Sequence, residues 1–358
     1  MARTKPPRTT PRRSRSERAH AARVGVLEPA RRAADAKGAP VLRVASIADG
    51  TLEEGEGNAA LKKALTRSGG VTWVDLTGAS AEEVAAITKI LGLHPLIAED
   101  ILEGNQRAKI EVTDELIHIV LFAFTYTDHA DRIEIDIVLG KDYLLTVHGP
   151  EWEPRSVPAL RGGLAPVLTR GPDHLLWALV DAIVDDYFPL LDKLGDEIED
   201  VQEHVIANAR PETLERLFAL KTELLGIRRA AAPIREIFNQ LTNRELALID
   251  DEEILYFRDV YDHLIRLTDE LDNYRELVSG TLDVYLSTVN NQLSLIMKRL
   301  TGVTVVLTGI AAIAGIFGMS EAGTALGGQE AGGFWLVTAG TIGLAFLMAW
   351  VLRRIGWI

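Results

Sequence analysis

Carboxylates are the residues of this sequence whose types and spacing best suit chemistry with cations. Residues 181–203 contain nine Asp or Glu and a single basic residue, Lys193. The run Asp250-Asp-Glu-Glu253 adds four more acidic groups. Carboxylates this close together repel one another and raise each other's pKa unless a cation neutralises them. Two interpretations stay open at this point, a solvated acidic face and a surface that concentrates divalent cations.

Two-metal hydrolysis is a third interpretation of paired carboxylates. The sequence contains no phosphate-binding loop to accompany them, so we expect that the protein is not an enzyme. It also contains no cysteine, which excludes disulfides, thiolate zinc sites and thiol catalysis. A metal site must then use oxygen ligands and a few histidines. That ligand set favours Mg²⁺ and leaves Co²⁺, Ni²⁺ and Zn²⁺ open.

A column of polar and small side chains marks a second candidate site. Its members step by three, four or seven positions and therefore share one helix face. They are Asp283, Asn290, Ser294, Met297, Thr301, Thr304, Thr308, Ala311 and Gly315. Carboxylate, carboxamide and hydroxyl groups in such a column suit a hydrated cation. A coiled-coil seam with polar residues that set the register is the alternative.

The segment that carries this column must be a very long helix. From Pro172 onward the apolar period is helical, and Pro189, Pro211 and Pro233 are expected to separate the helices. Residues 250–317 can form one uninterrupted helix of roughly 100 Å. Residues 300–317 and 334–352 lack charges, and each stretch is close to the roughly 20 residues that a membrane span needs. We predict two spans, with a buried helical hairpin as the alternative.

The charges that flank the two spans predict their orientation. Lys298-Arg299 precedes the first span and Arg353-Arg354 follows the second, whereas the connecting loop 318–333 contains two Glu and no Lys or Arg. By the positive-inside rule, both termini are cytoplasmic, the loop is external, and 353–358 is a cytoplasmic tail. A two-span subunit cannot enclose a pore alone. Conduction therefore requires an oligomer in which the first span lines the axis.

The N-terminal half predicts an α/β domain behind a basic arm. Residues 1–37 carry a net charge of +8 and are expected to form a disordered arm, which is either a solvated tail or a contact for anionic lipid. The rest of the chain carries a net charge of −21 and would repel nucleic acid. Residues 38–171 form the α/β domain, and 172–299 a helical domain and stalk. Ser80 is expected to cap a helix over Ala81–Leu91. The expected strands are Val41–Ile47, Val71–Leu76, Lys109–Val112, Ile117–Tyr126, Arg132–Leu139 and Asp142–Val147.

Several separate motifs, in the same order as in the family, resemble the CorA family of divalent-cation transporters over about residues 40–358. Near the C-terminus they include Tyr285-Leu-Ser and Ala314-Gly-Ile-Phe-Gly-Met319. Earlier motifs are His94-Pro-Leu-Ile-Ala-Glu-Asp100, Gln106-Arg-Ala-Lys-Ile110, Asp181-Ala-Ile-Val-Asp-Asp-Tyr-Phe188 and Tyr256-Phe-Arg-Asp-Val-Tyr-Asp-His263. The resemblance implies a funnel-shaped homopentamer in the plasma or inner membrane. It also implies Mg²⁺ influx, often with Co²⁺ and Ni²⁺, driven by the ion gradient and the membrane potential.

The resemblance further implies residue roles. Asp100 matches a carboxylate that senses cytoplasmic Mg²⁺ together with the match of Asp283 in the neighbouring subunit. A second metal site matches Glu99, Asp181, Asp259 and His263. Met297 and Leu300 match hydrophobic rings that block ions when the pore is narrow. The helix-face column and the resemblance together give the expected pore and selectivity residues: Asn290, Asn291, Ser294, Met297, Leu300, Thr301, Thr304, Thr308, Ala311, Gly318, Met319 and Ser320.

The mouth of the pore departs from the family pattern. The family's Gly-Met-Asn is replaced by Gly318-Met319-Ser320, and Ser294 stands where the stalk usually has a pore asparagine. Serine is shorter than asparagine and makes a wider ring with a single hydroxyl. Mg²⁺ is the expected cargo. A zinc or cobalt/nickel carrier of the same superfamily and a non-conducting, membrane-tethered cation sensor are the alternatives.

Overall fold

The computed structural model describes residues 40–104, 106–126, 129–207, 209–318 and 332–357. The basic arm 1–37 and the mouth residues Met319 and Ser320 lie outside these ranges. The described residues form two compact units. The first comprises the described parts of Met1–Lys193 with Glu223–Asp272, and the second comprises Leu194–Thr222 with Asn273–Ile358. Each unit is described by itself.

A seven-stranded mixed sheet organises the first unit, in the order β2-β1-β3-β7-β6-β5-β4. The strands pair antiparallel except β3 and β7, which run parallel. Their bounds are Val41–Ala48 (β1), Thr51–Glu56 (β2), Val71–Thr77 (β3), Lys109–Val112 (β4), Leu116–Tyr126 (β5), Ala130–Gly140 (β6) and Tyr143–His148 (β7). The expected α/β class is therefore confirmed, and each expected strand is present to within two residues at either end.

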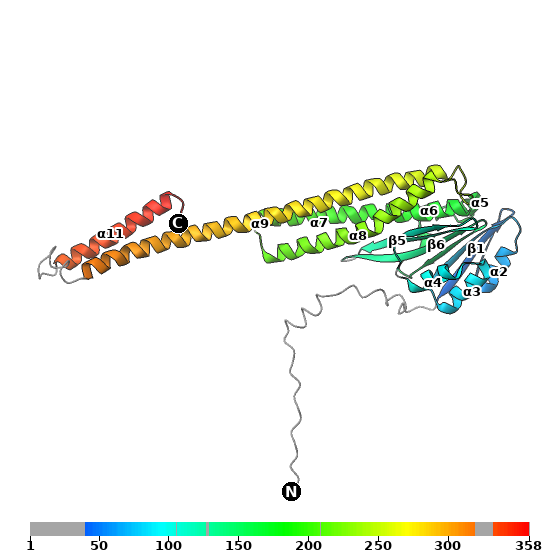
Figure 1. The fold of residues 1–358 in the computed structure, drawn as a ribbon, viewed down its shortest axis with the longest axis horizontal. Helices are drawn as coiled ribbons and strands as arrows, with labels where there is room; N and C mark the ends of the chain where they lie inside the picture. The colour runs from blue at the N-terminus through cyan, green and yellow to red at the C-terminus, as the bar shows by residue number, and fades with distance from the viewer. Residues whose placement is uncertain (1–39, 105, 127–128, 208, 319–331, 358) are drawn as a thin grey trace, which may run out of the picture. The chain divides into compact units, whose positions relative to one another are not determined.

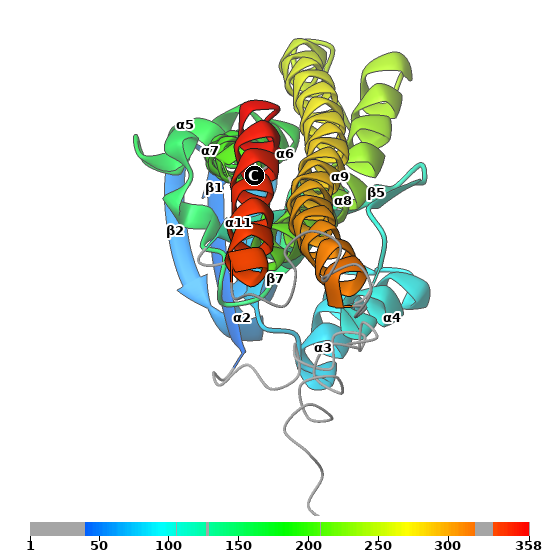
Figure 2. The ribbon, with the colours of Figure 1, turned by 90° about the vertical axis from the view of Figure 1, so that its left-hand side faces the viewer.

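Helices cover both faces of the sheet. Helices α2 (Gly57–Leu65), α3 (Ala81–Leu91) and α4 (Pro95–Glu103) lie together along one face (Figure 1), and the end-on view places α3 beside α4 (Figure 2). Their buried side chains share a core with alternate strand residues such as Leu116 and Val138. Helix α5 (Ala165–Arg170) packs on strands β1 and β3 of the sheet, and helix α6 (Pro172–Asp185) packs on β3, β5, β6 and β7. Two single 3₁₀ turns, Pro154–Ser156 and Pro158–Leu160, precede α5.

Local signals explain the ends of these helices. The Ser80 hydroxyl accepts the Glu83 amide at 3.2 Å, so α3 begins with the expected cap. One strand and three helices of this unit were not predicted: β2, α2, α4 and α5. Strand β2 reads TLEEGE, which lacks the β-branched content of a typical strand, and α4 begins at Pro95, a residue that favours the first helical position.

Three long helices follow, and prolines interrupt them less than expected. They are α7 (Tyr187–Ala207), α8 (Pro211–Asn243) and α9 (Ile254–Gly318). Pro211 begins α8 and Pro189 lies in the first turn of α7, as expected, but Pro233 lies inside α8. The expectation that Pro233 separates two helices is therefore wrong. A proline removes one backbone hydrogen bond, and the buried side chains around it, among them Ala230, Ala231, Ile234 and Ile237, offset that loss.

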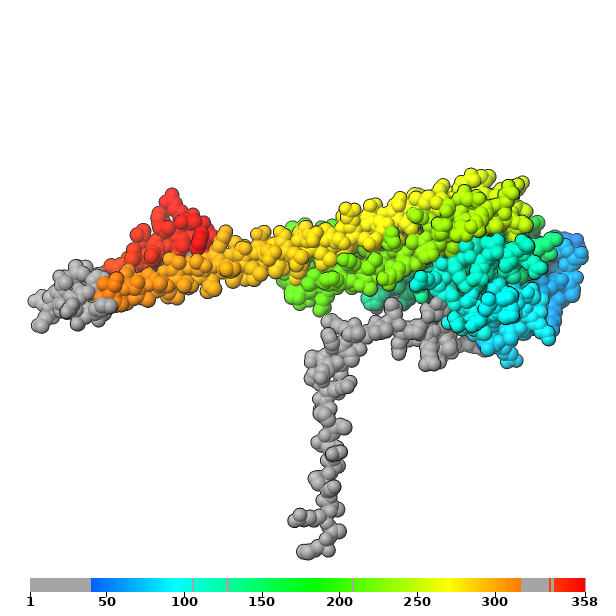
Figure 3. Space-filling view, in the orientation of Figure 1, coloured from blue at the N-terminus to red at the C-terminus, as the bar shows by residue number. Residues whose placement is uncertain are grey.

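Helix α9 is continuous over 65 residues, and it begins four residues later than the expected Asp250. Among the described residues, Ile254–Ile316 contains a stretch long and apolar enough to cross a membrane, and only 6% of that stretch is buried. A core helix of a soluble protein would be mostly buried, so the exposure distinguishes α9 from such a helix. Figure 3 shows the orange part of α9 as an exposed rod.

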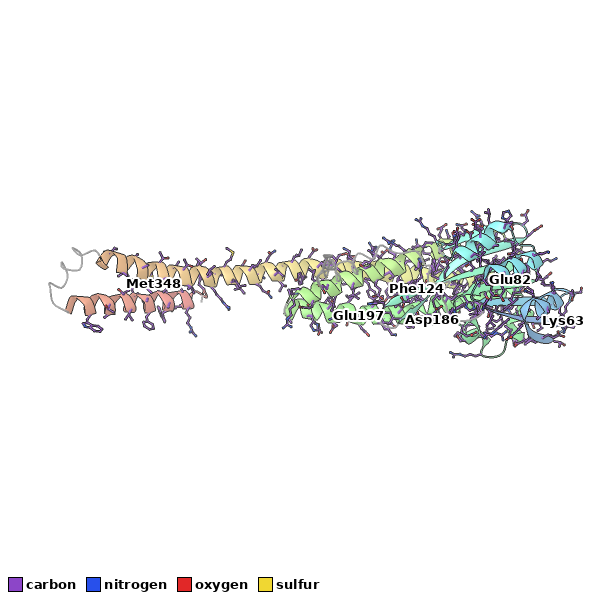
Figure 4. The ribbon with its side chains drawn as sticks, turned by 90° about the horizontal axis from the view of Figure 1, so that it is seen from below. Lys63, Glu82, Phe124, Asp186, Glu197 and Met348 are labelled. Atoms are coloured by element: carbon purple, nitrogen blue, oxygen red, sulfur yellow. The ribbon has the colours of Figure 1, made fainter. Side chains whose placement is uncertain are left out.

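Helix α11 (Gly332–Arg354) follows the loop and contacts α9 inside the second unit. Met348 of α11 lies against Gly309 of α9, where a Cβ atom would come within 3.2 Å of its sulfur (Figure 4). Glycine therefore permits a close approach of the two helices at this level. Whether α11 crosses the bilayer as the second span stays a prediction.

Candidate metal centres and ion path

Acidic side chains of α6 and α9 meet around His263 in the first unit. Asp181, Asp185 and His263 each offer a ligand atom, and these three atoms lie within 4.8 Å of one another. His263 Nδ1 lies 3.4 Å from Asp185, and Nε2 lies 3.9 Å from Asp259, one turn earlier on α9. Three of the four residues expected at the second metal site, Asp181, Asp259 and His263, are thus neighbours in one chain.

Charge repulsion is built into this cluster. Burial, and then the neighbouring carboxylate of Asp185, raise the pKa of Asp181 to about 6, against an opposing effect of His263. A bound divalent cation would relieve that repulsion, since it favours the ionised carboxylates. Glu99, the fourth expected residue, is exposed on α4 and lies outside the group.

Asp185 is the member of this cluster that sequence reasoning missed. It lies four residues after Asp181, so both carboxylates project from the same face of α6. That spacing was readable in the sequence and could have added Asp185 to the predicted set.

Asp100 is held on the short helix α4, whose two ends are well defined. The His94 ring nitrogen Nδ1 accepts the Leu96 amide at 3.3 Å, and Gly104 ends the helix with a φ of 54°, which favours glycine. Ile97 and Ile101 bury the inner face of α4. These contacts fix Asp100 over the strands β4 and β5.

The carboxylate of Asp100 already has a cationic partner within the chain. The Lys109 ammonium on β4 donates to Asp100 and also to Glu111, the latter at 2.8 Å. Burial would lower the pKa of Lys109, but the hydrogen bonds to Asp100 and Glu111 outweigh it and raise that pKa. A cation that binds at Asp100 must therefore compete with this ammonium.

The predicted ion path lies on α9 in the second unit. Asp283, Asn290, Asn291 and Ser294 are exposed, as are Met297, Leu300, Thr301, Thr304, Thr308 and Ala311. Asp283 and Asp100 belong to different units, so their pairing stays a prediction. Gly318 ends α9, and Met319 and Ser320 lie beyond the described residues. The opposite faces of α9 are exposed too and are apolar, for example at Leu293, Val303 and Leu307.

A buried ionic network anchors the beginning of α9. The carboxylate of Glu253, 3% exposed, accepts from Arg170 at 2.7 Å and lies 2.8 Å from His174 Nδ1. Asp173 beside it accepts the backbone amides of His174 and Asp250, each at 3.0 Å, although burial raises its pKa. The network ties the end of α5 and the beginning of α6 to the residues immediately before α9.

Comparison with known proteins shows which proteins this chain is similar to. The family model for CorA-like Mg²⁺ transporter proteins matches residues 68–354. The cobalt/magnesium transport protein CorA of Thermotoga maritima is 37% identical over 256 residues, which cover 70% of this chain and 73% of that protein. The CorA protein of Methanocaldococcus jannaschii is 25% identical over 80% of this chain and 91% of its own length.

Solved structures agree at the level of the fold. The complete CorA magnesium transporter of Methanocaldococcus jannaschii matches with a TM-score of 0.72 at 22% identity, over 90% of this chain and 99% of that chain. The full-length CmaX protein matches with a TM-score of 0.67 at 19% identity, over 90% and 100% of the two chains.

The fold and the helix α9 therefore define a membrane transporter of divalent cations, not an enzyme. The chain belongs to the CorA family.

Proposed function

We propose that this protein carries Mg²⁺ into the cell through a homopentameric pore whose axis is lined by α9. The observation that carries the proposal is the column of mostly polar and small residues along α9, from Asp283 to Gly315, on a part of the helix that is largely exposed. A hydrated cation needs hydrogen-bond acceptors along its path, and the exposed apolar faces of α9 need neighbouring helices or lipid. Both requirements are met if five copies of α9 surround one axis.

The proposed topology has two spans and both termini in the cytoplasm. Basic residues flank the outer ends of both spans, and the loop between them is acidic, as the positive-inside rule requires. The arm 1–37, the domains 38–171 and 172–299 and the tail 353–358 would then all face the cytoplasm. The acidic body of the protein would attract cations to the inner end of the pore.

The experiment that tests transport uses purified full-length protein in liposomes, with an imposed inside-negative potential and a fluorescent Mg²⁺ indicator inside. Potential-driven Mg²⁺ entry supports the proposal, and parallel runs with Zn²⁺ and Co²⁺ identify the cargo. Entry of Zn²⁺ or Co²⁺ alone would replace Mg²⁺ by one of the superfamily's other cargoes. An intact oligomer that passes none of these ions would instead be the non-conducting sensor.

We further propose that cytoplasmic Mg²⁺ closes the pore by joining Asp100 of one subunit to Asp283 of its neighbour, with Glu99, Asp181, Asp259 and His263 at a second site. A cation between two carboxylates holds like charges together, and its loss lets them separate. Asp100→Asn and Asp283→Asn should each weaken the protection that Mg²⁺ gives α9 against limited proteolysis. Wild-type protection in both variants would contradict this clamp.

Selectivity at the mouth is proposed to depend on Ser320. Ser320→Asn restores the family's carboxamide, which offers an additional acceptor to the water shell of the ion. We expect the variant to discriminate more strongly for Mg²⁺ against Co²⁺ in the liposome competition assay. Identical competition curves for the variant and the wild type would show that this position is not selective.

A further inference from the structure

The sheet face beneath α4 places a buried histidine beside the carboxylates of Asp100 and Glu111. One ligand atom from each of Asp100, Glu111 and His118 lies within 4.8 Å of the other two. Strand pairing produces this arrangement, since Glu111 of β4 is directly opposite His118 of β5. The three side chains come from three elements of one unit in one chain.

His118 has a carboxylate partner at one ring nitrogen and, within the described part of the chain, none at the other. Its ring is fully buried, and Nε2 lies 3.0 Å from the Asp136 carboxylate on β6. If Nε2 donates to Asp136, the neutral ring keeps a lone pair on Nδ1. Nδ1 is buried and has no hydrogen-bond partner among the described residues. A carboxylate behind the imidazole fixes the tautomer and raises the basicity of the ligand nitrogen in many metal sites.

A positive charge of the chain itself already lies between the carboxylates of Asp100 and Glu111. The Lys109 ammonium donates to both Asp100 and Glu111. It therefore neutralises the two carboxylates when no metal ion is bound. A divalent ion would take its place, and the ligand atoms would have to approach to about 3.4 Å from one another around a tetrahedral ion. Release of the lysine side chain toward solvent permits that contraction.

We propose that Asp100, Glu111 and His118 form a binding site for a borderline transition-metal ion such as Zn²⁺, Co²⁺ or Ni²⁺, within one chain and in competition with the Lys109 ammonium. Imidazole nitrogen is a good ligand for these ions and a poor one for Mg²⁺, which prefers oxygen. The site goes beyond the proposed transport of Mg²⁺ and does not need a neighbouring subunit. Because it uses Asp100, an occupied site removes that carboxylate from the proposed intersubunit clamp.

The reactivity of Lys109 toward an acylating reagent tests the site directly. Metal binding frees Lys109 from its two carboxylates and places a positive ion beside it. We therefore expect Zn²⁺ to accelerate the acetylation of Lys109 several-fold in the intact protein, as measured by mass spectrometry, whereas equal Mg²⁺ does so much less.

Variants separate this site from the other metal sites. Glu111→Gln, at an exposed position, and His118→Gln, which keeps a polar group facing Asp136, should both abolish the effect of Zn²⁺. Glu115→Gln is the matched control, since this exposed carboxylate lies outside the cluster, and it should behave as the wild type. In Asp283→Asn the effect of Zn²⁺ should persist, because the site needs no residue of the second unit.

Three results would overturn the proposal. They are equal acceleration by Mg²⁺ and Zn²⁺, an undiminished effect in Glu111→Gln, and loss of the effect in Asp283→Asn. The liposome assay is independent of all three. A protein that passes no Mg²⁺ but still shows zinc-dependent labelling would refute the transport proposal alone.

Discussion

Replacing Glu253 by alanine should lower the free energy of unfolding by about 3 kcal/mol, a typical cost for removing one partner of a buried ion pair. The substitution leaves His174, which is nearly buried, and Arg170 without their shared carboxylate. For a unit of this size, the loss corresponds to a thermal midpoint lower by about 6–12 °C. Because the network fixes the beginning of α9, we also expect faster proteolysis near Ile254.

Tryptophan fluorescence can follow unfolding of this region, since the ring centroid of Trp177 lies 4.9 Å from that of His174 and 4.7 Å from that of Tyr256. The matched control is Glu252→Ala, which removes the adjacent carboxylate at an exposed position. The control should unfold within about 0.5 kcal/mol of the wild type. Equal midpoints for the two variants would mean that the buried network does not stabilise the first unit.

Asp181→Asn should change how stability depends on pH in the metal-free protein. The pKa of Asp181 is about 6 in the folded chain, against an ordinary value of 3.8. The folded state therefore binds the proton more tightly than the unfolded state does. The stability due to this group is fully present below about pH 4 and is lost as the pH rises through about 6. Asparagine carries no charge, so the variant should lack this decrease.

The same change should blunt the response to divalent cations. At pH 7.5, Mg²⁺ is expected to stabilise the wild type more than Asp181→Asn, because the ion relieves repulsion that the variant no longer has. Thermal midpoints with and without Mg²⁺, from pH 4 to 8, measure both effects. Asp192→Asn, at an exposed position of the same acidic stretch, is the control. A wild-type pH profile in Asp181→Asn would contradict the assignment of the repulsion to this residue.

Local signals in the sequence were sufficient for most elements of the fold. The alternation of apolar and acidic residues located β6, and a serine three residues before a glutamate located the beginning of α3. The expectation of a helix boundary at Pro233 was wrong because a proline weakens a helix by a limited amount, and burial of the surrounding residues offsets that cost. In that case tertiary packing outweighed the local preference.

One candidate site could be predicted from the sequence, and the other could not. Asp181 and Asp185 share a helix turn, so their proximity is encoded in a spacing of four. Asp100, Glu111 and His118 come together because of the register of β4 against β5 and the position of α4 over these strands. No periodicity within one element contains that information. Motifs could identify Asp100 as a ligand, but only the folded sheet reveals the histidine beside it.

The strand β4 has one more consequence, for the behaviour of the protein at high concentration. It is an edge strand of four residues, and the opposite edge, β2, carries Glu53, Glu54 and Glu56. Short edges with charged side chains resist pairing with strands of other molecules, which otherwise leads to aggregation. Lys109 and Glu111 therefore protect an open sheet edge, in addition to their roles at the proposed cation site, where Glu111 is a ligand and Lys109 the competing cation. Substitutions that neutralise both should make the protein more prone to aggregate, even where its fold is unchanged.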